Sequence, residues 1–119
     1  MAKEIKPVVP YDDTFAKLDI RVGRVVEVER ETATPKPTYK MVVDFGAYGK
    51  KTSYGRFTNH PLDEVKGRLV LGVLNFGPKQ VGEVVSEVLI LGVQFPKADS
   101  GEATFVAPLR EAKIGSKMF

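Results

Sequence analysis

Short runs of β-branched and aromatic residues, separated by turn residues at close spacing, make up most of this chain. The clearest run lies at 39–45, where every second residue is apolar: Tyr39, Met41, Val43 and Phe45. Such alternation is typical of a strand with one buried face. Further strands are predicted near 20–28, 50–58, 68–74, 84–93 and 103–107. About six short strands with almost no helix predict a small all-β barrel or sandwich.

Two short helical segments interrupt this strand pattern. Residues 11–18 are predicted to form one helical turn, with Phe15 and Leu18 on one face and an aspartate as its cap. A second short helix is predicted to begin at Pro61. A strand series broken by one helix before its two most apolar strands fits a five-stranded OB-fold barrel with a C-terminal strand extension. Within the first strand, Gly23 is predicted to mark a bulge.

The chain is predicted to hold one domain, at 11–119, preceded by a flexible arm at 1–10. No apolar stretch approaches the roughly 20 residues of a membrane helix, and the first residues lack the apolar centre of a secretory signal. Cysteine is absent, which excludes disulfides, thiolate catalysis and cysteine zinc sites. We therefore expect a cytoplasmic protein.

The net charge of +3 is concentrated in the middle third of the chain. Residues 36–68 carry 7 Lys or Arg and 3 Asp or Glu, whereas the balance is −1 over 1–35 and 0 over 69–119. A local basic zone can guide a phosphate backbone. A solvated strand face with a chance excess of cations has the same composition, so charge alone leaves both interpretations open.

The residue types give little support to catalysis. His60 is the only histidine, and a hydrolytic triad or a histidine metal site would need more converging partners. The glycines form neither a phosphate loop nor a dinucleotide fingerprint. We therefore expect no enzyme, no metal and no cofactor.

Polar residues interrupt the two most apolar predicted strands. Asn75 follows the first of them, and Ser86-Glu87 lies inside the second. Burying an unpaired polar group costs roughly 1–3 kcal/mol or more. These side chains therefore either satisfy each other or a turn, or they face a ligand.

Residues 50–56 combine cations, hydroxyls and an aromatic ring, which is a composition suited to RNA. Lysine and arginine neutralise phosphates, and tyrosine offers a stacking face to an unpaired base. Strand parity places Tyr54 and Arg56 on one face, and Lys51 and Ser53 on the other. The alternative is an amphipathic strand whose tyrosine packs inside and whose lysines are solvated.

Three blocks of the chain resemble the stand-alone tRNA-binding domain family: 18–26, 40–46, and Asn75-Phe76 together with 86–92. The run at 37–41 resembles the short bacterial CsaA proteins within that family. The resemblance covers about residues 11–119. The chain departs from the family pattern at Gly82, which is displaced, and at Glu83, which stands where basic character is usual.

The resemblance implies an OB-fold homodimer that binds tRNA or structured RNA without catalysis. CsaA proteins are also described as export-related chaperones, so unfolded polypeptide is the alternative partner. A third hypothesis is an interaction module in which the polar residues only stabilise a turn and the barrel closure. The implied dimer contacts are Phe15, Leu18 and Met118. The expected RNA-binding residues are Lys50, Lys51, Ser53, Tyr54, Arg56, Asn75, Lys79, Gln80, Ser86 and Glu87, with Lys79 and Gln80 in the turn between the two apolar strands.

Overall fold

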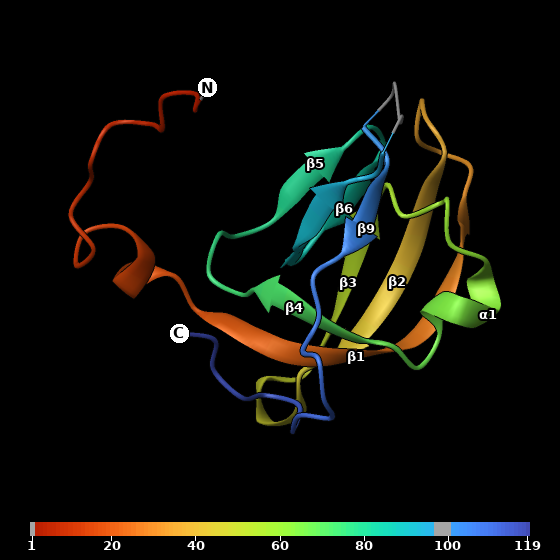
Figure 1. Ribbon diagram of the computed structural model, residues 1–119. Helices are drawn as coiled ribbons and strands as arrows, with labels where there is room; N and C mark the ends of the chain where they lie inside the picture. The colour runs from red at the N-terminus through yellow and green to blue at the C-terminus, as the bar shows by residue number, and fades with distance from the viewer. Residues whose placement is uncertain (1, 97–100) are drawn as a thin grey trace.

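The computed structural model describes residues 2–96 and 101–119, and its centre is a curved antiparallel sheet (Figure 1). The five strands lie in the order β3-β2-β1-β4-β7. Their bounds are Ile20–Glu31 (β1), Thr38–Asp44 (β2), Lys50–Gly55 (β3), Leu69–Val73 (β4) and Leu89–Ile90 (β7). The sheet curls into a nearly closed barrel, so the predicted all-β, OB-like barrel is confirmed.

Two small ribbons and three short helical segments complete the described part of the chain. The ribbons pair Lys79–Val81 (β5) with Val84–Ser86 (β6), and Gly92–Gln94 (β8) with Ala103–Phe105 (β9). The helical segments are Phe15–Lys17 (η1), Gly46–Tyr48 (η2) and Leu62–Val65 (α1). The predicted N-terminal turn, the helix before the fourth strand and the C-terminal strand are thus all present. No helix among the described residues is long and apolar enough to cross a membrane.

β1 is the long strand that joins the two halves of the barrel. Its first half pairs with β4 and its second half with β2, and the register shifts between Val25 and Glu27. A bulge bends a strand and increases its twist, which lets one strand serve both halves. The bulge predicted at Gly23 is therefore misplaced by a few residues.

Gly23 is required by packing instead. A Cβ atom there would lie 2.6 Å from Val43 Cγ1 and 2.7 Å from Phe45 Cε1. On the neighbouring strand, a Cβ at Gly72 would lie 2.7 Å from Phe45 Cζ. The Phe45 ring thus fills the space that two glycines leave open. It belongs to the barrel core, whose buried members are Val25, Tyr39, Met41, Val43, Phe45, Phe57, Val65, Val70, Val88 and Ile90.

A second apolar cluster lies on the other face of β1 and β4. Its buried members are Ile20, Val22, Leu69, Leu71 and Val73. Because clusters cover both faces of β4, all five residues of that strand are buried, which explains its continuous apolar run. Residues from both ends of the chain pack on this cluster and stay partly exposed, among them Phe15, Leu18, Ile114 and Met118.

The chain between 78 and 94 differs from the prediction. The strand predicted at 84–93 is divided into β6, β7 and β8. The Ser86 hydroxyl donates to the Val88 carbonyl at 3.0 Å and so bends the chain between β6 and β7. Lys79 and Gln80 belong to strand β5 rather than to a turn, and the turn of this ribbon falls at Gly82-Glu83. Gly82 has φ +61, which explains a glycine at that position.

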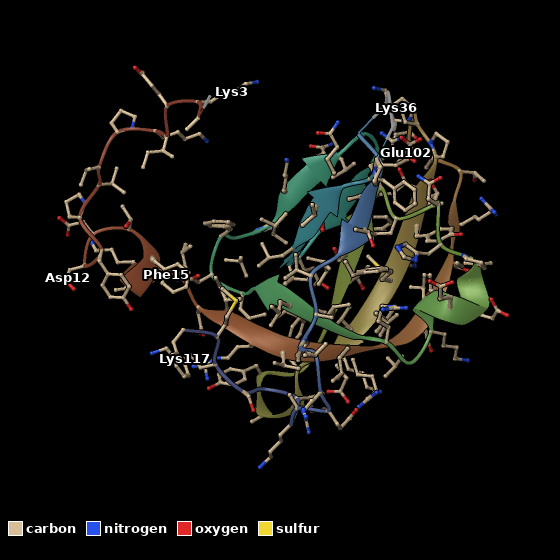
Figure 2. The ribbon with its side chains drawn as sticks, viewed as in Figure 1. Lys3, Asp12, Phe15, Lys36, Glu102 and Lys117 are labelled. Atoms are coloured by element: carbon tan, nitrogen blue, oxygen red, sulfur yellow. The ribbon has the colours of Figure 1, made fainter. Side chains whose placement is uncertain are left out.

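At the N-terminal end, residues 2–10 are exposed and form no regular secondary structure. Figure 2 shows Lys3 far from the barrel, whereas Phe15 lies close to the start of β1. The residue before η1 is Thr14, and no side chain in the described part of the chain caps this helix, so the predicted aspartate cap is wrong. The Thr14 hydroxyl instead donates to the Pro10 carbonyl at 2.6 Å.

Candidate nucleic-acid interface

Ser86 and Glu87 close the barrel against the free edge of β3. The Thr52 N–H donates to Glu87 Oε1 at 2.8 Å, and the Glu87 N–H donates to the Thr52 carbonyl at 2.8 Å. The Tyr54 N–H donates to Ser86 Oγ at 3.2 Å. Side-chain oxygens therefore accept from two β3 amides that a regular ladder would pair with backbone carbonyls. Ser86 is 7% exposed and Ser53, beside it, is 2% exposed, so both hydroxyls belong to this closure.

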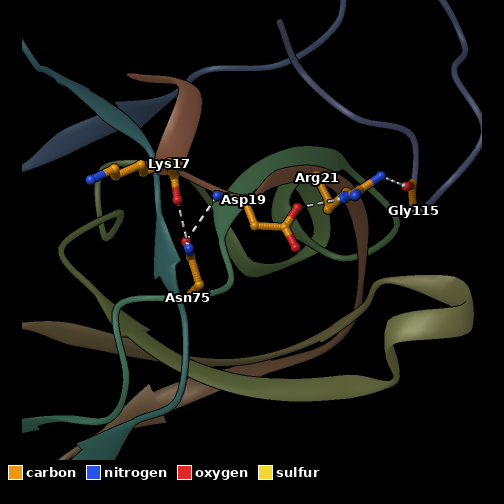
Figure 3. A network of polar contacts seen from close by, with 5 residues as sticks. All are labelled: Lys17, Asp19, Arg21, Asn75 and Gly115. Carbon is orange, nitrogen blue, oxygen red and sulfur yellow. Dashed lines mark hydrogen bonds and ion pairs between the residues drawn. The ribbon is translucent and has the colours of Figure 1, made fainter. Parts of the chain in front are cut away.

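Asn75 is bonded to the backbone in the same way, at the end of β4 (Figure 3). Its Oδ1 accepts from the Asp19 N–H at 2.8 Å, and its Nδ2 donates to the Lys17 carbonyl at 2.8 Å. The three polar residues that interrupt the apolar run thus all bond to the backbone. The sequence allowed two explanations for these residues, and the structure shows the first, in which they bond to nearby protein groups. Direct contact of these residues with RNA stays a prediction.

A groove of about 470 Å³ opens beside this closure. Residues of β3, of the β5–β6 ribbon, of β7 and of the β8–β9 ribbon line it. Its walls are mainly apolar, formed by Phe57, Val81, Val88, Leu89 and Ile90. Lys79 and Phe76 are exposed where they line it, Phe76 to 59%. The groove therefore offers apolar walls with a cation and an aromatic ring at its rim.

Half of the predicted RNA-binding residues line the groove: Ser53, Tyr54, Arg56, Lys79 and Ser86. The other five do not line it: Lys50, Lys51, Asn75, Gln80 and Glu87. Lys50 pairs opposite Asp44, at the other end of β3 from the groove-lining Gly55. The Gln80 amide donates to the Gly82 carbonyl at 3.1 Å, in the turn at the end of its own strand.

Arg56 is held in the groove wall by other protein groups. Its Nε donates to the Pro37 carbonyl at 2.6 Å, and its guanidinium lies 3.4 Å from the Glu102 carboxylate. The side chain is 21% exposed. Lys79 is more exposed, which makes it the better placed of the two cations for an incoming phosphate.

The basic residues of the middle third are not gathered at the groove. Lys66 and Arg68 line a second hollow, of about 400 Å³, together with Arg24 and Arg110. Acidic side chains accompany them, since Arg24 is paired with Glu111, and Arg68 lies 3.5 Å from Glu64. The local basic zone suggested by the sequence is therefore spread over separate surfaces.

His60 has converging partners that the sequence did not reveal. Its Nδ1 lies 2.8 Å from Glu64 Oε1, and its Nε2 lies 3.0 Å from Thr104 Oγ1. This order of hydroxyl, imidazole and carboxylate occurs in hydrolases. Here the ring packs 5.2 Å from Phe105, and neither His60 nor Thr104 lines the groove or the second hollow. Through His60 these contacts join β9 to α1, so they pack the two elements together.

The RNA-binding residues predicted from the sequence include neither Phe76 nor the apolar groove walls. Phe76 stands directly after Asn75 in a segment rich in turn residues, where an exposed ring has no packing purpose. That position is the signal that could have identified it. The wall residues carry no such signal, because a valine or isoleucine in a strand is equally suited to a core.

Comparison with known families assigns this barrel to a family. The family model described as "Putative tRNA binding domain" matches residues 20–117. The chain belongs to this tRNA-binding domain family. Among the relatives of the domain are the methionine–tRNA ligases of Bacteroides fragilis and Pyrococcus abyssi, each 32% identical over 117 residues, or 98% of this chain. The chain covers 16% and 15% of those two ligases, so it corresponds to a small part of each enzyme.

Two solved structures resemble this tRNA-binding domain over their full length. The CsaA chaperone protein of Picrophilus torridus is 34% identical, with a TM-score of 0.83, and the match covers 94% of this chain and 100% of that one. The CsaA chaperone of Bacillus anthracis is 31% identical, with a TM-score of 0.86, and covers 95% and 100%. The predicted resemblance to the tRNA-binding domain family and to CsaA-like proteins is confirmed.

Proposed function

We propose that this chain binds tRNA, or another structured RNA, at the groove and its rim, and that it catalyses no reaction. The observation that carries the proposal is the groove itself, which opens beside the Ser86-Glu87 closure of a tRNA-binding domain barrel and has Lys79 at its rim. In OB-fold proteins, a strand face and the adjoining loops bind oligonucleotides. The location of the groove agrees with that mode of binding.

Each part of the groove suits a different part of a nucleotide. Lys79 would neutralise a backbone phosphate. Phe76 and Tyr54 would offer ring faces to unpaired bases. The apolar walls would contact a base or a ribose, because they offer neither a hydrogen bond nor an opposite charge to an anionic phosphate. Lys50 and Lys51, at the other end of β3, would contact the backbone of a large RNA outside the groove.

The role we propose for Asn75, Ser86 and Glu87 is to shape the site. Their side chains already bond to protein backbone at 2.8 to 3.2 Å. A substitution at these positions would therefore act on RNA binding mainly through the positions of β3 and of the loop at 74–78. The third hypothesis held that these residues only stabilise a turn and the barrel closure. We propose that they do so in a protein that also binds RNA.

The proposed assembly is a homodimer that works in the cytoplasm, where tRNA is found. Phe15, Leu18 and Met118 are only partly buried against the second apolar cluster. In the N-terminal arm, Ile5 and Val8 are 90% and 97% exposed. A second copy that covered these surfaces would remove apolar area from water, which is the main driving force of association.

Binding of unfolded polypeptide is the second candidate function. The apolar walls of the groove favour it, because apolar clefts accept apolar side chains. The two CsaA structures that resemble this chain are titled as chaperones. The two candidate functions differ in the ligand that binds in the groove.

The test measures fluorescence anisotropy of labelled tRNA titrated with the wild-type chain, with Lys79→Ala and with Lys113→Ala as a charge-matched control. Lys113 is exposed on the C-terminal segment and lines neither the groove nor the second hollow. We expect tight binding that Lys79→Ala weakens and Lys113→Ala leaves unchanged. Absence of tRNA binding, together with binding of an unfolded polypeptide, would favour the second candidate.

A further inference from the structure

The segment that leads from β4 into the groove rim is hydrogen-bonded to residues 17–19, just before β1. Besides the two bonds of the Asn75 amide, the Leu74 N–H donates to the Asp19 carbonyl at 2.8 Å. Asn75 is thus bonded to residues that lie 56 and 58 positions earlier in the sequence. Phe76, Gly77 and Lys79, which line the groove, follow directly.

The polar contacts continue from Asp19 to the C-terminal segment (Figure 3). The Asp19 carboxylate accepts from Arg21 Nε at 2.6 Å, and an Arg21 amino group donates to the Gly115 carbonyl at 3.3 Å. The same guanidinium lies 4.6 Å from the centre of the Tyr48 ring. Arg21 also forms a β-bridge with Lys117. A connected set of contacts therefore runs from the groove rim through Asn75 to the C-terminal segment.

The residues at the far side of these contacts pack on the second apolar cluster. Phe15 and Leu18 stand just before Asp19, and Ile114 and Met118 flank the residues that meet Arg21. Truncating Phe15 would loosen η1 where it carries Lys17, whose carbonyl accepts from Asn75. Changes at this apolar surface therefore have a physical route to the groove rim, and the Asn75 side chain supplies two of its three hydrogen bonds.

We propose that Asn75 is a positioning residue that couples the groove rim to the terminal segments on the second apolar cluster. The inference rests on the proposed function for its binding readout. An asparagine fits this place because one side chain must both accept a hydrogen bond and donate one. An aspartate would keep the bond from the Asp19 N–H and lose the bond to the Lys17 carbonyl, while adding a negative charge beside the Asp19 carboxylate.

The test is a double-mutant cycle on tRNA affinity with Asn75→Ala, Phe15→Ala and the double variant. We expect Asn75→Ala to weaken binding by about tenfold and Phe15→Ala by about threefold, with the double variant no weaker than Asn75→Ala alone. Leu109→Ala is the control and should leave affinity unchanged, because this side chain is 99% exposed and lines the second hollow rather than the groove. A merely structural role of Asn75 would give effects that multiply in the double variant, and that result would overturn the proposal.

Hydrogen exchange of the backbone amides of Phe76, Gly77 and Lys79 gives a readout that needs no RNA. If the coupling exists, Phe15→Ala accelerates exchange at these amides in the wild-type background and adds nothing in the Asn75→Ala background. Unchanged exchange in Phe15→Ala would contradict the coupling even in a chain that binds tRNA. Accelerated exchange without tRNA binding would support the coupling and refute the proposed function, so the two failures are distinguishable.

Discussion

Glu87 and Thr52 exchange two hydrogen bonds of 2.8 Å across the gap between β6 and β3. In one bond the Glu87 N–H donates to the Thr52 carbonyl, as in an antiparallel ladder. In the other, the Glu87 carboxylate takes the place of a backbone carbonyl as acceptor for the Thr52 N–H. An ionisable residue in an apolar run is thereby explained, since the barrel closes on its side chain.

Replacing Glu87 tests this closure. We expect Glu87→Ala to lower the free energy of unfolding by about 1–2 kcal/mol, because the Thr52 N–H loses its acceptor. Glu87→Gln keeps a side-chain carbonyl and should retain most of the wild-type stability. Urea unfolding of the three proteins measures the difference. Equal losses in both variants would mean that the charge, rather than the acceptor, is what matters.

Gly23 is predicted to be intolerant of a methyl group. Gly23→Ala should lower the free energy of unfolding by about 1–3 kcal/mol, because its Cβ would overlap the side chains of Val43 and Phe45. Phe45→Leu in the same chain frees space beside β1. The loss in the double variant should therefore be smaller than the sum of the two single losses. Additive losses would show that the predicted overlap is not the cause.

Lys79 is predicted to act on RNA through its charge. Lys79→Ala should weaken tRNA binding and reduce the slope of log affinity against log salt by about 1. Its free energy of unfolding should change by less than about 0.5 kcal/mol, because the side chain is exposed. Titrations at several salt concentrations, with Lys113→Ala in parallel, measure both effects. A wild-type slope in Lys79→Ala would remove this residue from the site.

Phe76 is predicted to stack on a base. Phe76→Ala should cost about 1–3 kcal/mol of tRNA binding free energy. It should change stability little, since the ring is 59% exposed. Phe76→Leu separates the two candidate functions. It keeps an apolar side chain and should bind tRNA poorly, whereas capture of an unfolded polypeptide should survive the change. Wild-type tRNA affinity in both variants would exclude stacking at this position.

The barrel could be predicted from the sequence because its local signals agree with its topology. The alternation at 39–45 places Met41 and Val43 in the core, and both are buried in the structure. The breaks at 84–93 could not be predicted, because a continuous apolar run does not show where the chain bends. The chain bends where the Ser86 hydroxyl donates to the Val88 carbonyl, and this contact depends on the fold around it.

Part of the candidate site was predictable because a residue type conflicts with its surroundings. Asn75, Ser86 and Glu87 are polar residues in apolar runs, and that conflict identified them. Their partners Lys17, Thr52 and Tyr54 are ordinary residues far away in the sequence, so nothing indicated the pairing. The same limit applies to His60 and Thr104, which are 44 residues apart.

We propose that RNA binds at this surface through its phosphates and its shape. The measurement that tests it most directly is the affinity of the wild-type chain for folded tRNA as salt rises from about 50 to about 200 mM. We expect a straight line of log affinity against log salt, with roughly 0.7–0.9 of slope for each phosphate contact. No detectable tRNA binding at low salt, or an affinity that does not change with salt, would contradict it.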